Sequence, residues 1–295
     1  MNKFKITSSA YFNKEKTVSQ AFPPGHFYSP VIDPDEIESM KDQIWPMDLN
    51  PIAGIDFNDT NHKHVLTELF PKYIQDYDYP DSSTDDDSQF FNQNSQFSWL
   101  DSRAAFVLLR EWSPSTIIEV GSGFSSLLIS DINRRFWGSK CHFTCIEPYP
   151  REFLNNNING ISGLIQNKVQ NVSLDFFDQL SSNDVLFIDS SHVSKTGSDV
   201  NYLYFEVLPR LKKGVKIHIH DIFLPQDYPK DWVMDDKRSW NEQYLLRALL
   251  MYSTAFQVVF GCSYAYQTMS ELVEKGLSTP KERSHGGGSL WIEKL

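Results

Sequence analysis

One stretch, residues 116–126, constrains the fold more than any other. β-Branched residues occupy 116–118 and 120 with an acid, Glu119, between them; the chain then breaks into Gly-Ser-Gly, and an apolar helical pattern follows. This order predicts a buried strand, a tight turn and the start of a helix. Glycines at such a turn let the backbone approach a ligand, and the free amides of the new helix face the same point. Alone, a Gly-x-Gly turn is a weak signal, so its meaning depends on what surrounds it.

Apolar runs of strand length alternate with helical patterns after Phe97. Helices are predicted from Phe97 to Ser113, from the turn to Arg135, over 199–211 and over 240–252. The alternation implies an α/β fold with a doubly wound, mostly parallel seven-stranded sheet covered on both faces. The predicted strands are 116–120, 142–146, 163–165, 184–188, 215–219, 256–260 and 289–293.

Two local patterns predict where helices begin. Asp199 could cap the helix over 199–211, which Lys212-Lys213-Gly214 closes. Ser239-Trp240-Asn241-Glu242 has the spacing of a capping box. We interpret the helix after it as core, with Asn241 and Glu242 able to reach a pocket from its first turn.

Charge and cysteine content narrow the class of protein. The net charge is -11 and no basic cluster relieves it, so nucleic acid and anionic membranes are poor partners. No apolar run is long enough to span a bilayer, and no signal peptide is recognisable. Cys141, Cys145 and Cys262 lack metal-finger spacing, which indicates buried free thiols in a reducing compartment. We therefore expect a soluble, cytoplasmic protein.

The first 96 residues differ from the rest of the chain. Pro23–Pro30 is stiff and aromatic, and short helices are predicted over 35–43 and 61–70. Asp81–Asp87 is polar and acidic and is predicted to be an exposed loop. A calcium site is the alternative interpretation, but the alternation and glycine of a calcium loop are missing. We predict an irregular, helical N-terminal extension over residues 1–96, which caps the sheet's rim, and a second domain over residues 97–295.

Four acidic residues fall at the ends of predicted strands: Glu119, Glu147, Asp189 and Asp221. Ligands of doubly wound sheets bind at the carboxyl ends of the strands, near the point where strand order reverses. Four acids on one rim are hard to attribute to folding alone, so they indicate a ligand site there.

These stretches resemble class I S-adenosylmethionine-dependent methyltransferases. The resemblance implies a Rossmann-like sheet that ends in an antiparallel hairpin, with S-adenosylmethionine as the cofactor. A nicotinamide dinucleotide enzyme is the nearest rival, but its fingerprint needs a glycine where Ser126 stands. The resemblance covers Phe97 to the C-terminus, and its matching parts are Glu119–Gly123, Ile146–Pro148, Asp184–His192 and Gly214–Asp221.

The resemblance also implies roles at the cofactor site. Gly121 and Gly123 would let the backbone pass close to the methionine part, Glu147 would accept hydrogen bonds from the ribose, and Gln170 would flank the adenine. Each role has an alternative interpretation without a ligand. The turn could serve only packing at a strand–helix junction, and Glu147 could be a solvated acid in a loop. The full implied set is Glu119, Gly121, Ser122, Gly123, Phe124, Ser125, Glu147, Pro148, Gln170, Asp189 and Ser190.

A second pattern, Asp189-Ser190-Ser191-His192 with His218-Ile219-His220-Asp221, resembles the metal-dependent branches of this family. These include catechol-type and macrolide-sugar O-methyltransferases and cephalosporin-hydroxylase-like proteins. By this resemblance Asp189, His220 and Asp221 would bind Mg²⁺ or another divalent metal, which would hold the acceptor hydroxyl and lower its pKa. His192 would take the hydroxyl proton as a neutral imidazole.

The match to that pattern is imperfect. Ile222 stands where a second oxygen ligand is usual, and His220 favours a transition metal over magnesium. A metal-free alternative keeps His192 or His220 as the base and Asp221 as its orienting partner, so the predicted catalytic set is His192, His220 and Asp221. We interpret His218 as a packed core histidine that points to the face opposite His220.

The expected function is O-methylation of a small polar acceptor by a S-adenosylmethionine-dependent methyltransferase. A sugar or glycoside hydroxyl is favoured over a catechol, because the aromatic N-terminal arm suits stacking on a sugar ring. His26 and Tyr28 in that arm are equally compatible with lining the acceptor site and with packing. The alternatives are a metal-dependent hydroxylase or hydrolase on the same fold, and a cofactor-binding protein without catalysis. Acceptor identity, O- or N-methylation, the metal and a homo-oligomeric state stay open.

Overall fold

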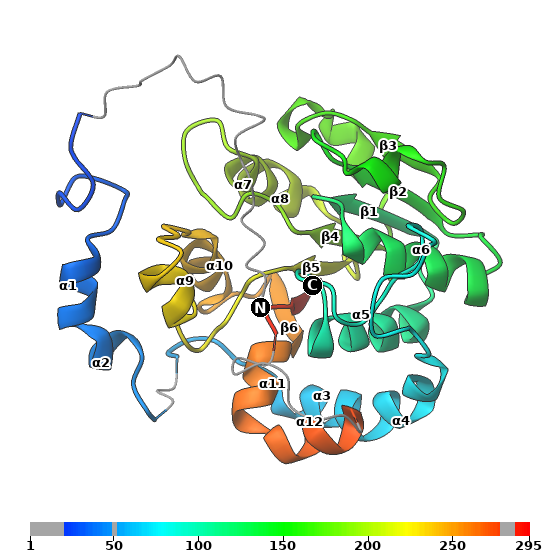
Figure 1. The fold of residues 1–295 in the computed structure, drawn as a ribbon, viewed down its shortest axis with the longest axis horizontal. Coiled ribbons are helices and arrows are strands. Elements are labelled where there is room, and N and C mark those ends of the chain that lie inside the picture. The colour runs from blue at the N-terminus through cyan, green and yellow to red at the C-terminus, as the bar shows by residue number, and fades with distance from the viewer. Residues whose placement is uncertain (1–20, 49–51, 278–286) are drawn as a thin grey trace.

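The core of the computed structural model, which describes residues 21–48, 52–277 and 287–295, is a seven-stranded sheet (Figure 1). Its strand order is β3-β2-β1-β4-β5-β7-β6, with the first five strands parallel and β7 antiparallel to both its neighbours. The predicted doubly wound sheet and closing hairpin are confirmed. The strands are β1 (Thr116–Val120), β2 (His142–Ile146), β3 (Gly163–Ile165), β4 (Val185–Ile188), β5 (Lys216–Ile219), β6 (Phe256–Gly261) and β7 (Leu290–Lys294).

Two hydrophobic layers cover the sheet, because successive residues of each strand point to opposite faces. Ile117 and Phe187 face one layer, whereas Ile118 and Leu186 face the other. The first layer contains η2 (Val65–Leu69), α4 (Phe70–Tyr73), α5 (Trp99–Trp112), α6 (Phe124–Phe136), α11 (Cys262–Thr268) and α12 (Ser270–Leu277). The second contains η5 (Val169–Asn171), η6 (Leu174–Gln179), α7 (Asp199–Tyr202), η7 (Leu203–Val207), α8 (Leu208–Arg210) and α10 (Glu242–Leu250).

Two of the expected helix caps are wrong. The side chain of Ser198, and not that of Asp199, caps α7 by accepting from the amide of Asn201. Ser239 does not form a capping box, since α10 begins at Glu242 and the hydroxyl of Ser239 accepts from the amide of Ile32. The side chains of Asp199 and Glu242 are bound elsewhere, so the local pattern alone predicted the wrong partners.

The helix predicted over 199–211 is interrupted by the π-helical turn η7. Pro209 follows this turn and has no amide hydrogen to donate to the preceding turn, which favours a local widening. The same arrangement recurs where η2 precedes Pro71. In both places the apolar face still reaches the core, so the layer is preserved.

The N-terminal segment divides into a packed part and an arm. Val65, Phe70 and Phe90 belong to the same hydrophobic core as the sheet. The arm carries α1 (Pro34–Ser39) and α2 (Lys41–Ile44), which lie apart from the sheet in Figure 1. Residues 1–20 and 49–51 lie outside the described parts, and the cap role of residues 1–96 stays a prediction. The remaining short helices are α3 (Asp59–His64), η3 (Ile74–Asp76), η4 (Glu152–Asn155) and α9 (Lys230–Met234).

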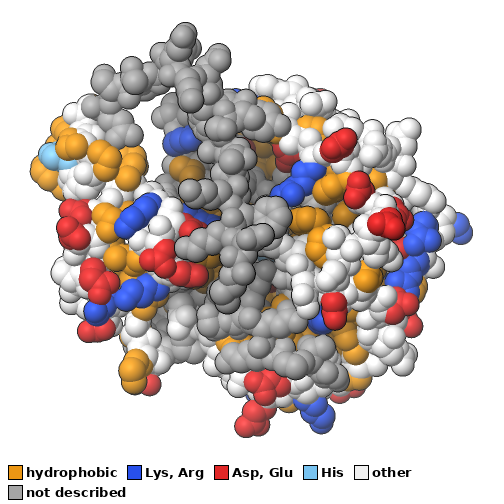
Figure 2. All heavy atoms as spheres, viewed as in Figure 1, with side chains coloured by type: hydrophobic (Ala, Val, Ile, Leu, Met, Phe, Trp, Pro, Cys, Tyr) orange, Lys and Arg blue, Asp and Glu red, His pale blue; other side chains and the backbone are white. Residues whose placement is uncertain are grey.

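Surface features agree with several sequence-based expectations. Residues 81–87 are exposed and form neither helix nor strand, as predicted. Acidic and basic side chains are interspersed on the face seen in Figure 2. No helix in the described parts of the chain is long and apolar enough to span a bilayer. At the arm, hydrophobic side chains gather around a histidine (Figure 2), and the rings of His26 and Tyr28 pack against each other and against Phe22 and Phe27.

Candidate functional site

The carboxyl ends of β2, β1, β4 and β5 meet at one edge of the sheet, because these strands are parallel. Backbone hydrogen bonds continue between them for one residue past the strands. The amide of Gly121 donates to Ile146 O (3.0 Å), that of Asp189 to Val120 O (2.8 Å), and that of His220 to Ile188 O (2.9 Å). Strand order reverses between β1 and β4, so this edge is the position at which doubly wound sheets bind ligands.

The turn after β1 is tightly packed at Gly121 and open at Gly123. Gly121 has φ +79°, and a Cβ atom placed there would lie 1.7 Å from the backbone oxygen of Asp189. At Gly123 the nearest atoms to such a Cβ, from Gln96 and Arg151, are 3.8 and 4.0 Å away. Folding therefore requires the first glycine, whereas the second leaves space beside the first turn of α6.

Glu119 is not on the rim, although the strand-end pattern predicted it there. Its side chain is fully buried, and its carboxylate accepts hydrogen bonds from the hydroxyls of Ser125 (2.7 Å) and Ser126 and from the thiol of Cys145 (3.4 Å). Burial raises the pKa of Glu119 to about 7, although these donors work in the opposite direction. Glu119 and Ser125 therefore support the turn from within.

Glu147 lies on the rim, as predicted. Its carboxylate accepts from the amides of Ser122 (3.2 Å) and Tyr149 (2.8 Å), so it joins the end of β2 to the glycine turn. Pro148, which follows it, is half-buried. The ring of Phe124 packs on Phe91 and Phe153.

Two predicted cofactor residues have buried polar atoms that find no hydrogen-bond partner among the described residues. They are Ser190, through its hydroxyl, and Gln170, through Oε1, whereas Nε2 of Gln170 donates to Gly197 O (3.2 Å). Buried polar groups are nearly always hydrogen-bonded, so unpaired groups near one edge mark places where a polar ligand can bind.

Asp189, His192 and Asp221 form a compact cluster beside this turn. His192 Nε2 lies 3.3 Å from Asp189 Oδ1 and 3.5 Å from Asp221 Oδ2. One potential ligand atom from each residue lies within 4.8 Å of the others, which is compatible with a shared metal ion. His192 and Asp221 have φ +60° and +58°, in the left-handed region that Asp and His adopt more readily than most other non-glycine residues.

His220 is not a member of this compact group, although the sequence pattern predicted it as a metal ligand. Its Nε2 lies 3.5 Å from Oδ1 of Asp221, the other oxygen of that carboxylate. Two carboxylates suit an oxygen-preferring ion such as Mg²⁺, and an imidazole nitrogen suits a transition metal. The donor set at this cluster therefore fits a divalent cation, with His192 rather than His220 as the nearest nitrogen.

The protonation of the cluster is set by opposing effects. Burial lowers the pKa of His192, but the carboxylates of Asp189, Glu242 and Asp221 outweigh it and raise the pKa well above its usual value. Burial raises the pKa of Asp221, and the neighbouring His220 and His192 only partly offset it. This arrangement favours a protonated His192 near neutral pH, whereas the base role predicted from the sequence needs the neutral form.

His218 and His220 point to the same face of β5, so the expectation of opposite faces is wrong. Residues two apart along a strand share a face. The two rings are stacked with centroids 5.6 Å apart, and the hydroxyl of Ser289 lies 2.9 Å from His218 Nε2 and 3.4 Å from His220 Nδ1. His218 is fully buried against Phe187 and Trp291, which confirms the packed core role.

Asp101 and Ser289 were not predicted, and they support the cluster from below. Asp101 accepts from the amides of Gly288 (3.0 Å) and Ser289 (2.8 Å). A Cβ atom at Gly288 would lie 2.9 Å from Cα of Asp221, so glycine lets the start of β7 pass close to the site. The sequence did contain a signal for Asp101, because an acid among the apolar residues of a predicted core helix needs a buried partner.

Glu242 contacts the site through His192. Its Oε2 atom lies 2.9 Å from His192 Nδ1, and its side chain is fully buried. The sequence indicated that Glu242 could reach a pocket, but it assigned the orienting role for the base to Asp221. Asp221 lies near Nε2 of His192, so the structure brings a different carboxylate to Nδ1.

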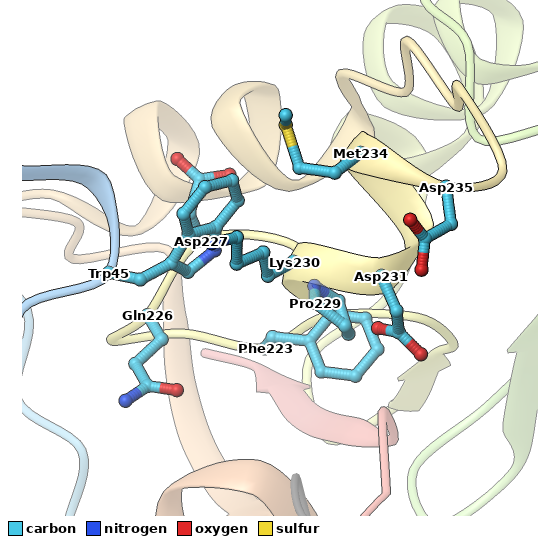
Figure 3. A pocket seen from close by; sticks show the side chains of 9 residues that line it. All are labelled: Trp45, Phe223, Gln226, Asp227, Pro229, Lys230, Asp231, Met234 and Asp235. Atoms are coloured by element: carbon cyan, nitrogen blue, oxygen red, sulfur yellow. The ribbon is translucent and has the colours of Figure 1, made fainter. Parts of the chain in front are cut away.

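A cavity of about 450 Å³ opens between the N-terminal arm and α9 (Figure 3). The rings of Trp45 and Phe223 line it, together with Gln226 and the carboxylates of Asp231 and Asp235. Phe223 comes two residues after Asp221, and the indole of Trp45 donates to the backbone oxygen of Tyr228 (2.8 Å). The arm thus contributes an aromatic side chain to this cavity near the end of β5.

Comparison with known proteins gives a family model and a relative that match along the sequence, and several solved structures that match in fold. A family model described as a methyltransferase domain matches residues 118–222. An uncharacterized protein of Archaeoglobus fulgidus is 34% identical over 203 residues, which cover 65% of this chain and 91% of the relative.

Two solved structures show more distant similarity. The plantazolicin methyltransferase BpumL, in complex with a triazolic desmethylPZN analog and SAH, is 14% identical, with a TM-score of 0.37 over 63% of this chain and 85% of that chain. The MycE methyltransferase of the mycinamycin pathway, in complex with Mg, SAH and mycinamycin VI, is 14% identical, with a TM-score of 0.35 over 78% of this chain and 54% of that chain.

Proposed function

Because this chain belongs to the class I S-adenosylmethionine-dependent methyltransferases, we propose that it methylates a hydroxyl group of a small polar acceptor, with a sugar or glycoside as the favoured class. One observation carries this proposal. The backbone of Asp189 packs against the Gly121 turn, while its carboxylate faces His192 and Asp221. The methyl-donor turn and an acid–imidazole cluster thus share one residue, so donor and acceptor chemistry lie side by side.

The donor site is proposed at the turn and the two strand ends next to it. Gly123 and the hydroxyl of Ser122 face the methionine part, and Glu147 accepts from the ribose hydroxyls. Gln170 and Ser190, each with an unpaired buried oxygen, complete the polar contacts to the ligand. The buried Glu119 holds the turn in place without touching the ligand.

Asp189 and Asp221 are the proposed holders of a divalent cation, with His192 Nε2 as the nearest nitrogen. A cation bound there would lower the pKa of an acceptor hydroxyl. The two carboxylates that favour a proton on Nε2 of His192 are the same ones that would bind the cation. A bound cation therefore disfavours a proton on Nε2 of His192. Once that proton has left, Nε2 can take the proton of the substrate hydroxyl.

The favoured acceptor class rests on the cavity beside α9. The ring of Trp45 offers a flat apolar surface for one face of a sugar ring, and Gln226, Asp231 and Asp235 offer partners for hydroxyl groups. The arm before residue 49 then contributes to acceptor binding, as the predicted cap over the acceptor site would. Three buried free thiols suit a reducing compartment, so we place the enzyme in the cytoplasm.

Calorimetry and a methyl-transfer screen test this proposal. We expect S-adenosylmethionine and its demethylated product to bind, and label from the methyl group to appear on methyl glucosides rather than on 3,4-dihydroxybenzoate. Absence of binding would end the proposal. If methyl transfer persists in EDTA, the metal part of the proposal is wrong and the methyl-transfer part stands. Oxygen consumption without methyl transfer would favour the hydroxylase alternative.

A further inference from the structure

We propose that Glu242 is a positioning residue that orients His192, so that Nε2 faces Asp189 and Asp221. This inference rests on the proposed function for the role of His192. The contact between Glu242 and His192 can be tested without a methyl acceptor. Glu242 lies fifty residues beyond His192 in the chain, at the first position of α10. Residues 238–242, which lie before and at the first position of α10, restrain this imidazole in three ways.

The first restraint is at the ring nitrogen that faces away from the cluster. Glu242 Oε2 lies 2.9 Å from His192 Nδ1, a distance for a strong hydrogen bond to a carboxylate. Both side chains are buried, with 0% of Glu242 and 5% of His192 exposed. A carboxylate at Nδ1 keeps the proton on that nitrogen and leaves Nε2 available on the side of Asp189 and Asp221.

The second restraint acts through the backbone. The amides of Asn241 (3.1 Å) and Glu242 (3.2 Å) both donate to the backbone oxygen of His192. The side chain of Asn241 accepts from the amide of Ser194 (2.6 Å) and donates to its carbonyl (3.2 Å). These four bonds tie the loop after β4 to α10 and support the left-handed conformation of His192.

The third restraint is on the face of the ring. The indole of Trp240 packs against the imidazole of His192, with ring centroids 4.3 Å apart. The guanidinium of Arg238 lies over Trp240, 4.6 Å from its centroid. The imidazole is thus held at Nδ1, along its face and through its backbone, all from residues 238–242.

A purely structural role explains Glu242 poorly. A buried carboxylate loses its hydration and contributes little to stability even when it is paired, so an apolar side chain of similar size would serve packing at least as well. The acid is therefore better explained by what it does to His192 than by the stability of α10.

The test compares Glu242→Gln and Glu242→Leu with wild type, with Glu206→Gln as a control on an exposed face nearby. In proton NMR, an imidazole N–H bonded to a carboxylate gives a strongly downfield resonance, which His192→Gln assigns by its loss. We expect this resonance in wild type and Glu206→Gln. It should move upfield in Glu242→Gln, because a neutral oxygen is a weaker acceptor, and disappear in Glu242→Leu.

Kinetics then test the consequence of the contact. With the best acceptor of the screen, kcat should fall at least about tenfold in Glu242→Leu and less in Glu242→Gln, with KM for S-adenosylmethionine unchanged. A downfield resonance that persists in Glu242→Leu overturns the proposal, and so does an unchanged kcat in that variant. If wild type binds S-adenosylmethionine but methylates nothing, the proposed function fails, while the resonance alone still decides whether Glu242 orients His192.

Discussion

The backbone oxygen of Asp189 occupies the space that a side chain at Gly121 would need. A Cβ atom at position 121 would lie 1.7 Å from that oxygen, and the φ of +79° is itself unfavourable for other residues. This contact joins the turn after β1 to the loop after β4 across the switch point of the sheet. The glycine turn and the acid cluster therefore cannot be displaced independently.

Gly121→Ala should destabilise the whole domain and abolish cofactor binding. The added methyl group must push two backbone segments apart at the centre of the sheet, at a cost of about 3 kcal/mol or more in unfolding free energy. Denaturant unfolding and calorimetry measure the two effects. Gly163→Ala is the matched control, since no atom lies within 4 Å of a Cβ there and its stability should be close to wild type.

Gly123→Ala should separate binding from folding. Its Cβ would meet only ordinary contacts, the nearest at 3.8 Å, so we expect the unfolding free energy to change by less than about 1 kcal/mol. The same methyl group would fill space proposed for the methionine part of the cofactor. Calorimetry should show at least about tenfold weaker binding of S-adenosylmethionine. Unchanged affinity would mean that the ligand does not approach the turn here.

Glu119→Gln should change how stability depends on pH. The folded-state pKa of Glu119 is raised from 4.5 to about 7, so between these values the unfolded chain has lost the proton and the folded chain keeps it. The contribution of Glu119 to stability therefore falls as pH rises through this window, by about 1.4 kcal/mol per pH unit and about 3 kcal/mol in total. Glu119→Gln should lack this component.

The comparison is made by urea unfolding at several pH values, with the exposed Glu271→Gln as a control for general charge effects. The difference in unfolding free energy between wild type and Glu119→Gln should shrink or reverse in sign from acid to neutral pH. A difference that is constant with pH would show that Glu119 does not retain its proton in the folded protein.

Asp221→Asn should remove cation binding without a loss of stability in the absence of a cation. Burial raises the pKa of Asp221, and Asp189 beside it adds repulsion between like charges, so neutralising one member costs the apo protein little. Thermal unfolding with and without Mg²⁺ or Mn²⁺ measures this. Wild type and the exposed Asp175→Asn should be stabilised by the cation, and Asp221→Asn should not. An equal shift in all three proteins would place the cation elsewhere.

The sheet was readable from the sequence because each strand is an apolar run bounded by turn residues. All seven strands lie within one residue of their predicted ends, and the Gly-Ser-Gly turn follows β1 as expected. Parallel strands bring their carboxyl ends to one edge, so Glu147, Asp189 and Asp221 could also be placed together from their positions in the chain.

Several partners within the site could not be read in this way. Ser239 and Asp199 both have the sequence pattern of a helix cap, but their side chains bind other groups. Ser239 accepts a hydrogen bond from the amide of Ile32, which is distant in the chain, and Asp199 accepts one from the amide of Ser191 in the preceding loop. Strand periodicity places His218 and His220 on the same face of the sheet, because residues two apart in a strand point the same way. The contrary expectation misapplied this rule, and the sequence itself contained the right answer. The partner of His192 Nδ1 is fifty residues away, which no local spacing encodes.

The sequence by itself determined the order of strands and helices, the glycine turn, and which acids stand at strand ends, because these depend on short-range periodicity and backbone preference. Only the tertiary structure decided that Glu119 is buried beneath the turn, that His192 and not His220 lies between Asp189 and Asp221, and that α10 supplies the carboxylate at Nδ1. Those features depend on how separate segments pack, since packing sets burial, and burial and neighbouring charges set the chemistry of each side chain.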